Sequence, residues 1–363
     1  MFIFAVSPGL DLSFIGEKAI EDFNALMAKL DSIYNIGCRH FAIFFDDITA
    51  QSGDGKNQAV FLNKLQEALD SKYPDMNPII TVPTQYCRQD MIDKDGNVKE
   101  YTKDFVNYLD EKINVLYTGD GVVCDGISDE SYKMAIDIYK RDLGIWWNYP
   151  VNDFLQSKLA LGPIEKLPTS NIKSIFYNPM GEVQLSKIAL ATGGEYAYSP
   201  KTYDSDKSWD RVLKGQFGDI SEAMKVFATH SRHMENTWAK VGPPDAPEFY
   251  ELGHQAILDV RMKKVPDFSL LLELIDKMDN AAEILLKKLP SEILSECKLQ
   301  LQQFKRIIYA DRIAVKSLKD RELDSNLKTL RADITEHESE ARLSEESAVK
   351  FIDEVIDMFE KKN

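Results

Sequence analysis

Residues Phe41–Thr49 read FAIFFDDIT, and this stretch decides how the rest of the chain is interpreted. Its first five residues form an unbroken apolar run of strand-forming types, which predicts a strand buried on both faces of a parallel sheet. The run ends in Asp46 and Asp47. Adjacent carboxylates at the end of a buried parallel strand lie where α/β folds keep their chemistry, and each shifts the other's pKa. For an isolated pair, a solvated turn that caps the next helix would be the simpler interpretation.

Composition limits the possible functions. The chain has 363 residues, of which 44% are hydrophobic and 28% charged, and it carries a net charge of −15. This composition is typical of a globular protein of one or two domains. The negative charge argues against nucleic acid and against an anionic membrane surface as partners. No stretch reaches the length of a membrane span, the opening residues lack the features of a signal peptide, and the location in the cell stays open.

Metal and cofactor chemistry is not indicated by the sequence. The four cysteines lack paired spacing, so we expect free thiols rather than a zinc site or disulfides: Cys38, Cys87, Cys124 and Cys297. His230 and His233 could bind a metal, but without an acidic partner at ligand spacing we expect histidines on a helix surface. We therefore expect neither a metal nor a cofactor.

Six short apolar runs alternate with stretches of helical spacing, which predicts a parallel sheet. The runs are Phe2–Val6, Phe41–Phe45, Pro78–Val82, Ile113–Tyr117, Leu143–Trp147 and Ile172–Tyr177. Each is followed by a polar, aromatic or glycine-rich cluster, as on the catalytic face of a (β/α)8 barrel. A complete barrel needs eight strands, however, and the chain offers six.

The pattern changes after about Asp210. Apolar residues three or four apart run from Leu271 to Leu289, Pro290 interrupts them, and the spacing resumes from Leu294 to Ile308. This predicts an antiparallel helix pair or bundle. Leu318–Asn363 is richer in charge and predicts further helices that pack on a thin apolar stripe. We expect a barrel at residues 1–215, a helical bundle at 216–318 and additional helices at 319–363.

Several enzyme classes can be weighed against the carboxylate pair. The run before Asp46 also resembles a Walker B strand, but the chain has no GxxxxGK[ST], and it has no GxSxG for a serine hydrolase. Near the predicted strand ends lie aromatic, amide and carboxylate side chains: Tyr86, Trp146, Trp147, Asn148, Tyr149, Asp153 and Asn178. Such groups suit a sugar, whose ring faces are apolar and whose hydroxyls need donors and acceptors.

Seven motifs resemble glycoside hydrolase family 84 in order and spacing. They are FAVSPGLDL (4–12), FAIFFDDI (41–48), VPTQY (82–86), YTGD (117–120), IWWNYPVNDF (145–154), LGP (161–163) and NPM (178–180). This family contains β-N-acetylglucosaminidases, among them bacterial enzymes called hyaluronidases and the animal O-GlcNAcases. The segment Met234–Glu248 resembles the helical domain of clostridial members. The resemblance covers about residues 1 to 318.

The resemblance implies a (β/α)8 barrel that removes terminal β-linked N-acetylglucosamine with retention, using the substrate's own acetamido group as nucleophile. Asp46 would accept the acetamide N–H, and Asp47 would be the general acid and then the base. The other implied roles are an acetamido contact for Tyr86, Val82, Thr118 and Asp120, a wall for Trp147, hydroxyl contacts for Asn148, Asp153 and Asn178, and an aglycone contact for Trp238. Singly, Tyr86, Trp147, Asn178 and Trp238 could each be ordinary loop, core, turn or helix-packing residues.

The chain departs from the family at its start. Relatives carry two further strand–helix units before the one that begins here, so we expect a TIM barrel lacking its first two βα units, followed by an all-α helical bundle domain. An upstream segment or a second chain would complete the barrel. The expected substrate is a glycan or glycoprotein that bears N-acetylglucosamine. The alternative is a non-catalytic sugar-binding or scaffold protein derived from the family.

Overall fold

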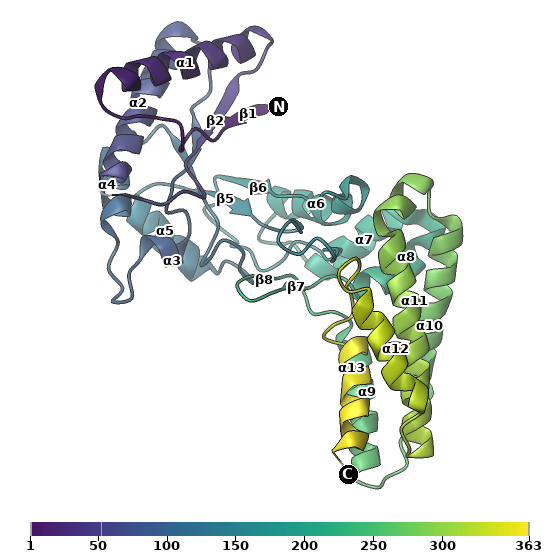
Figure 1. Cartoon of the computed structure of the whole chain (residues 1–363). Coiled ribbons are helices and arrows are strands. Elements are labelled where there is room, and N and C mark those ends of the chain that lie inside the picture. Colours follow the sequence, from purple (N-terminus) through teal and green to yellow (C-terminus); the bar gives the residue numbers. More distant parts are fainter. Residues whose placement is uncertain (1, 52, 362–363) are drawn as a thin grey trace. The chain divides into compact units, whose positions relative to one another are not determined.

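The computed structural model describes residues 2–51 and 53–361. Its main sheet has six parallel strands in sequence order: β1 (Ile3–Val6), β2 (His40–Phe44), β3 (Ile80–Val82), β4 (Asn114–Tyr117), β5 (Gly144–Trp147) and β6 (Ser174–Tyr177). The helices between them are α1 (Gly16–Asn35), α2 (Asp54–Lys72), α3 (Arg88–Met91), α4 (Glu100–Tyr108) and α5 (Asp129–Tyr139) (Figure 1). All six predicted strands are present, and the sheet forms the expected partial barrel.

Strand β2 is buried on both faces, as its sequence predicts. Phe41 and Ile43 are 1% and 0% exposed on one face, and Ala42 is 1% exposed on the other. Phe44 lies opposite Val82 in the parallel register, and the Phe45 N–H donates to the Val82 carbonyl at 2.8 Å. The ends of β2 and β3 therefore lie side by side, and the loops that follow them start next to each other.

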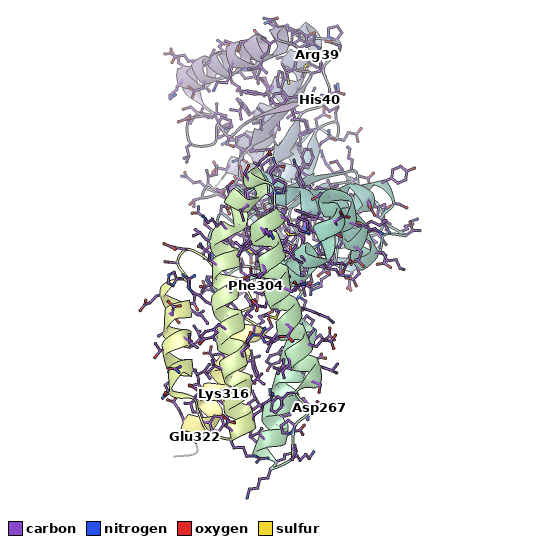
Figure 2. All side chains as sticks on the ribbon, turned by 90° about the vertical axis from the view of Figure 1, so that its right-hand side faces the viewer. Arg39, His40, Asp267, Phe304, Lys316 and Glu322 are labelled. Atoms are coloured by element: carbon purple, nitrogen blue, oxygen red, sulfur yellow. The ribbon has the colours of Figure 1, made fainter. Side chains whose placement is uncertain are left out.

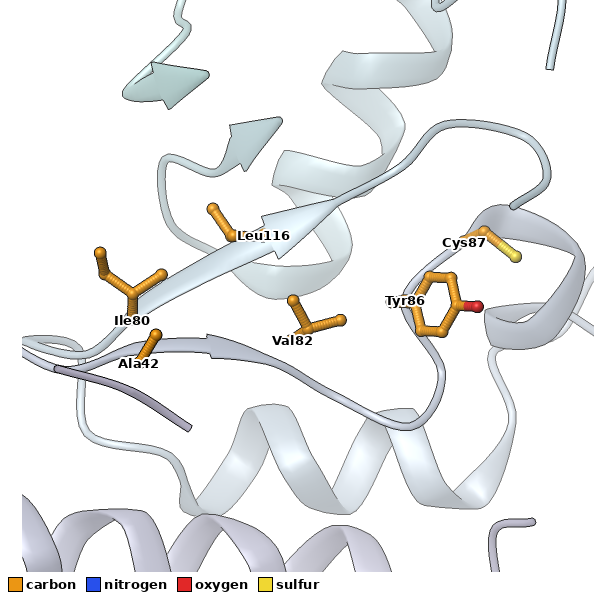
Figure 3. Packing of buried hydrophobic residues seen from close by; sticks show 6 residues of the cluster. All are labelled: Ala42, Ile80, Val82, Tyr86, Cys87 and Leu116. Atoms are coloured by element: carbon orange, nitrogen blue, oxygen red, sulfur yellow. The ribbon is translucent and has the colours of Figure 1, made fainter. Parts of the chain in front are cut away.

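An apolar cluster lines one face of the sheet (Figure 3). Its buried members are Ala42, Ile80, Val82, Tyr86, Cys87 and Leu116, and half-buried aromatic residues pack against it, namely Phe44, Trp146 and Phe176. Trp146 contacts Phe44 edge to face at 5.6 Å between ring centroids and stacks on Phe176 at 6.3 Å. This face continues past the strand ends to Tyr86, which links the core of the sheet to the candidate site.

The chain forms two compact units. The first comprises residues 1–147 and 166–176 and holds nearly all of the sheet, and the second comprises residues 148–165 and 177–363. Compact packing units and family domains divide a chain by different criteria, so the expected domain boundaries at residues 215 and 318 remain a prediction.

The described part of the second unit is mainly helical and also contains the hairpin β7 (Met234–Glu235) and β8 (Lys240–Val241). Its helical elements are α6 (Val183–Tyr198), α7 (Ser205–Phe217), η1 (Gly218–Ile220), α8 (Ser221–Thr229), α9 (Pro247–Arg261), α10 (Ser269–Lys288), α11 (Ser291–Asp320), α12 (Ser325–Glu336) and α13 (Ala348–Glu360). Helices α10 and α11 form the predicted antiparallel pair, and Phe304 of α11 is fully buried (Figure 2).

The C-terminal helices belong to the same bundle. Both α12 and α13 pack on α11, and α13 also packs on α9. The predicted apolar stripe of α13 is buried at Val349, Ile352 and Val355, and half-buried at Ile356 and Phe359. Among the described residues, no helix combines the length and the apolar character that crossing a membrane would require.

Candidate active site

The carboxylate pair begins two residues after the end of β2. Asp46 is half-buried, whereas Asp47 is exposed. Asp47 has a φ of 55°, in the left-handed region, which aspartate adopts more readily than most residues. The Tyr86 hydroxyl donates a hydrogen bond of 3.0 Å to Asp47 Oδ1. The structure therefore brings Asp46, Asp47 and Tyr86 together at the ends of β2 and β3.

The local environment affects the acidity of these groups. Burial raises the pKa of Asp46 above its usual value of 3.8, and the negative charge of Asp47 raises it further, while a backbone hydrogen bond opposes both effects. Burial also raises the pKa of Tyr86 well above its usual range, and the adjacent Asp47 adds to that rise. Tyr86 is therefore a neutral hydrogen-bond donor at this site.

A buried network holds the loop that carries Tyr86. Thr84 Oγ1 donates to the Phe45 carbonyl at 2.8 Å and accepts from Gln58 Nε2 at 3.0 Å. The Thr84 N–H donates to the Tyr101 hydroxyl at 2.9 Å, and that hydroxyl also bonds Gln58. Helices α2 and α4 thus fix the loop after β3. The sequence offered no signal for this network, because isolated polar residues within helices usually face water.

A pocket of about 200 Å³ opens on the loops after β2 and β3. Its lining residues are Asp47, Ile48, Ala50, Thr84, Gln85, Tyr86, Asp90 and Lys99. The predicted site residues among them are Asp47 and Tyr86. The pocket is polar and bounded by three charged side chains, so it suits a ligand with several hydrogen-bonding groups.

The residues predicted at the end of β4 are engaged locally. Thr118 is buried, and its hydroxyl donates to the Gly121 carbonyl at 3.0 Å. The exposed Asp120 accepts a 2.6 Å bond from the Ser131 hydroxyl and lies 4.0 Å from Arg88. The backbone N–H of Thr118 donates to the Tyr86 carbonyl at 3.2 Å, which ties this loop to the one after β3.

The two tryptophans of β5 face opposite sides of the sheet, as neighbouring strand residues do. Trp147, the predicted wall residue, is 3% exposed. Trp146 is half-buried and packs against the cluster that contains Val82 and Tyr86. Of the two, Trp146 therefore shares its sheet face with the candidate site. The alternation of side chains along a strand predicts that Trp146 and Trp147 lie on opposite faces of the sheet. The sequence did not show which of the two faces carries the site.

The remaining predicted residues lie in the second unit. The Asn178 amide donates to Asn148 Oδ1 at 3.1 Å, and both side chains are half-buried. Asp153 is exposed. Trp238, in the β7–β8 turn, is 58% exposed and contacts the Phe154 ring at 5.3 Å between centroids. This unit thus pairs two amides that suit sugar hydroxyls, and it presents an exposed aromatic ring.

Fold and site together define the class: an α/β partial barrel with a carboxylate pair and a tyrosine at its strand ends, joined to a helical bundle. Two family models match the chain. One is described as beta-N-acetylglucosaminidase and matches residues 1–229, and the other as hyaluronidase post-catalytic domain-like, matching residues 259–352. The chain belongs to the β-N-acetylglucosaminidase family, glycoside hydrolase family 84.

Individual relatives agree with this assignment. Protein O-GlcNAcase of Mus musculus is 32% identical over 205 residues, which are 53% of this chain and 21% of that protein. The solved structure of CpGH84B is 31% identical with a TM-score of 0.87, covering 98% of this chain and 64% of that one. An O-GlcNAc hydrolase of Thermobaculum terrenum has the same fold at 24% identity and a TM-score of 0.81, over 98% of this chain and 78% of its own. The chain thus spans only part of the relatives that it matches.

Proposed function

We propose that this chain forms part of a retaining β-N-acetylglucosaminidase that removes terminal β-linked N-acetylglucosamine from glycoconjugates such as O-GlcNAc proteins. The observation that carries the proposal is the grouping of Asp46, Asp47 and Tyr86 at the ends of two paired strands, in a chain that belongs to this family. We assign the catalytic barrel to residues 1–215, the helical bundle to 216–318 and additional helices to 319–363.

The proposed reaction has two steps. In the first, Asp46 accepts the acetamide N–H and orients the carbonyl oxygen, which attacks the anomeric carbon as the glycosidic bond breaks. Asp47 gives its proton to the departing oxygen, and an oxazoline-like intermediate remains. In the second, Asp47 takes a proton from water, and the water oxygen attacks the anomeric carbon and opens the ring with overall retention.

Tyr86 would change its partner when substrate binds. In the structure its single hydroxyl proton is committed to Asp47 at 3.0 Å. We propose that the hydroxyl turns to the acetamido oxygen of a bound sugar, which frees Asp47 to act on the leaving oxygen. Val82 would contact the acetamido methyl group, and Thr118 and Asp120 would lie at the same end of the sugar. Asn148, Asp153 and Asn178 would bind hydroxyls, and Trp238 the aglycone.

Hydrolysis of an aryl β-N-acetylglucosaminide is the direct test. In a chain whose barrel is completed by two further βα units, we expect turnover that a thiazoline mimic of the oxazoline inhibits, because the mimic has the cyclised geometry of the intermediate. A substrate with hydroxyl in place of the 2-acetamido group should be nearly inert. A trapped covalent sugar–aspartate adduct would contradict the mechanism. Sugar binding without turnover, in a chain with a complete barrel, would favour the non-catalytic alternative.

A further inference from the structure

Three side chains of the second unit gather donor atoms of the types that bind divalent transition metals. His233 Nε2 lies 2.8 Å from Glu235 Oε2 and 3.7 Å from Glu346 Oε1. One ligand atom from each of the three residues lies within 4.8 Å of the other two. His233 and Glu235 belong to the hairpin segment, and Glu346 lies in the turn before α13. Imidazole and carboxylate together are a common donor set for zinc.

The histidine ring is held in one orientation. His233 is 3% exposed, and its backbone N–H donates to Asp245 Oδ1 at 2.9 Å. Its Nδ1 lies 3.0 Å from the carbonyl oxygen of Gly242, which can only accept. The proton is therefore on Nδ1, and Nε2 faces the carboxylates. A backbone carbonyl that fixes the second nitrogen in this way is the usual support of a metal-binding histidine.

A positive charge is needed between these groups. With its proton on Nδ1, a neutral ring would direct a lone pair at Glu235 Oε2 from 2.8 Å, an unfavourable contact between two acceptors. Lys240 Nζ, 3.2 Å from the same carboxylate oxygen, offsets part of the negative charge but does not separate the two acceptors. Either a second proton on the ring or a bound cation resolves the contact.

We propose that His233, Glu235 and Glu346 bind a divalent transition metal ion, with zinc the expected occupant. Zinc holds nitrogen and oxygen ligands at about 2.0–2.2 Å, which places tetrahedral donors about 3.4 Å apart. The observed separations of 2.8 and 3.7 Å lie on either side of that value. The Glu235 and Glu346 side chains are 44% and 41% exposed, so both have room to adjust around an ion.

The turn that carries Glu346 is fixed to the segment that carries His233. The Ser344 N–H donates to the His230 carbonyl at 2.8 Å, and His230 Nδ1 lies 2.9 Å from Ser344 Oγ. Burial lowers the pKa of His230 to about 4, so its ring is neutral at pH 7 and supports this turn. The carboxylate donors are thus brought together by hydrogen bonds between residues far apart in the sequence.

The sequence interpretation of these histidines as surface helix residues was wrong. His230 is 4% exposed at the end of α8, and His233 is buried just before β7. One acidic partner lies two positions along the strand, and the other more than 100 positions along the chain, where no spacing rule could identify it.

A metal at this place would have a structural role. It would link the β7–β8 hairpin to the turn before α13, and Trp238 lies at the tip of that hairpin. Asn236 Oδ1 accepts from the Trp238 and Ala239 N–H groups and shapes the tip, but these bonds do not attach the hairpin to the bundle. The metal would add to the hydrogen bonds between Ser344 and His230 that already link these two segments, and it would raise the stability of the unit.

Zinc binding by the whole chain, stripped of metal with a chelator, tests the proposal. Competition with a chromophoric zinc indicator at pH 7.5 should show one zinc ion per chain, and zinc should raise the melting temperature. Glu346→Gln should bind at least about tenfold more weakly and lose the thermal shift. Glu340, an exposed carboxylate six positions before Glu346 in the sequence, provides the matched control, and Glu340→Gln should behave as the parent chain.

Two results would overturn the metal site: no zinc bound by the parent chain, or equal binding by Glu346→Gln and the parent. The ring nitrogens of the five histidines provide an independent measurement by ¹⁵N NMR. Zinc should shift Nε2 of His233 and leave the buried His230 unchanged. An imidazolium signal of His233 that does not respond to zinc would show that a second proton occupies the position.

Discussion

At the residue scale, the Asp46–Asp47 pair shows how one step along the chain separates two identical side chains. Asp46 is half-buried in the turn that follows β2, whereas Asp47 is exposed and has left-handed backbone geometry. Burial raises the pKa of Asp46, and the hydroxyl of Tyr86 contacts Asp47. The sequence predicted a pair with divided roles. Which carboxylate would be the more buried depends on the turn geometry, which the sequence did not determine.

The proposed roles predict different responses to the leaving group. Asp47→Asn should slow hydrolysis of substrates with poor leaving groups by about 10²–10⁴-fold, because general acid catalysis contributes that much. Activated aryl glycosides need little proton transfer and should lose far less. Asp46→Asn should slow both kinds of substrate, since the acetamido nucleophile must be oriented in either case. Values of kcat/KM for the two kinds of substrate, measured in a chain with a complete barrel, decide between the roles, and equal losses for Asp47→Asn would refute its assignment as the acid.

The raised pKa of Asp46 predicts how activity declines on the acidic side of its pH profile. Its role requires the ionised form, and burial raises its pKa above 3.8. Activity should therefore fall as the pH drops through this raised pKa, at a higher pH than an ordinary aspartate would give. The profile of kcat/KM against pH in a complete barrel would show it. If the Asp46→Asn variant shows the same loss of activity at low pH, that loss is due to the titration of another group.

The tryptophans of β5 should separate binding from stability. Trp146→Ala should raise KM or weaken binding of the thiazoline mimic with little loss of stability. Trp146 is only half-buried, and it lies on the sheet face that carries the candidate site. Trp147→Ala should destabilise the first unit by about 3–5 kcal/mol, the usual cost of truncating a buried aromatic. Denaturant unfolding and inhibitor binding measure the two effects. The reverse result would restore Trp147 as the wall of the pocket.

At the scale of elements, the strands and the helix pair could be predicted because each carries its own signal. Apolar runs placed all six strands within a few residues, and Pro290 marked the start of α11. The β7–β8 hairpin was missed because its strands have only two residues each. The Gln58–Thr84–Tyr101 network was missed because it depends on which helix faces meet. These features arise from tertiary packing and leave no local pattern.

The packing of α2 on α4 gives a prediction at this scale. A Cβ on Gly55 would lie 2.2 Å from the Tyr101 carbonyl oxygen, so Gly55→Ala must push the two helices apart. We expect a loss of about 1–3 kcal/mol, as for other overpacked contacts. In a chain with a complete barrel, activity should fall as well, because Tyr101 holds the loop that carries Tyr86. Gly121→Ala is the control, since its Cβ would meet nothing closer than 3.6 Å. Equal stability of the two variants would contradict the argument.

At the scale of the whole molecule, the partial barrel has two end strands, β1 and β6. End strands offer unpaired backbone groups to other strands. On the sheet face that carries the apolar cluster, Phe44, Trp146 and Phe176 are only half-buried. The six strands could be counted from the sequence. That a complete barrel would have two more strands follows from the family resemblance.

The open sheet predicts how the recombinant 363-residue chain behaves. Strand edges and a half-covered apolar face favour association between chains, so we expect low solubility, self-association in light scattering and little turnover of aryl substrates. Two added βα units from a family relative, about 60 residues, should close the barrel and restore both solubility and activity.

A proline in the added strand that pairs with β1 provides the control for closure. Proline removes a ladder hydrogen bond and is excluded from central strands, so this variant should behave like the unextended chain although its composition is almost the same. Restored activity in the proline variant would show that the added residues act without pairing to β1. A soluble, fully active monomer of the 363 residues alone would refute the argument outright, because it would place a working site on a sheet that is not closed.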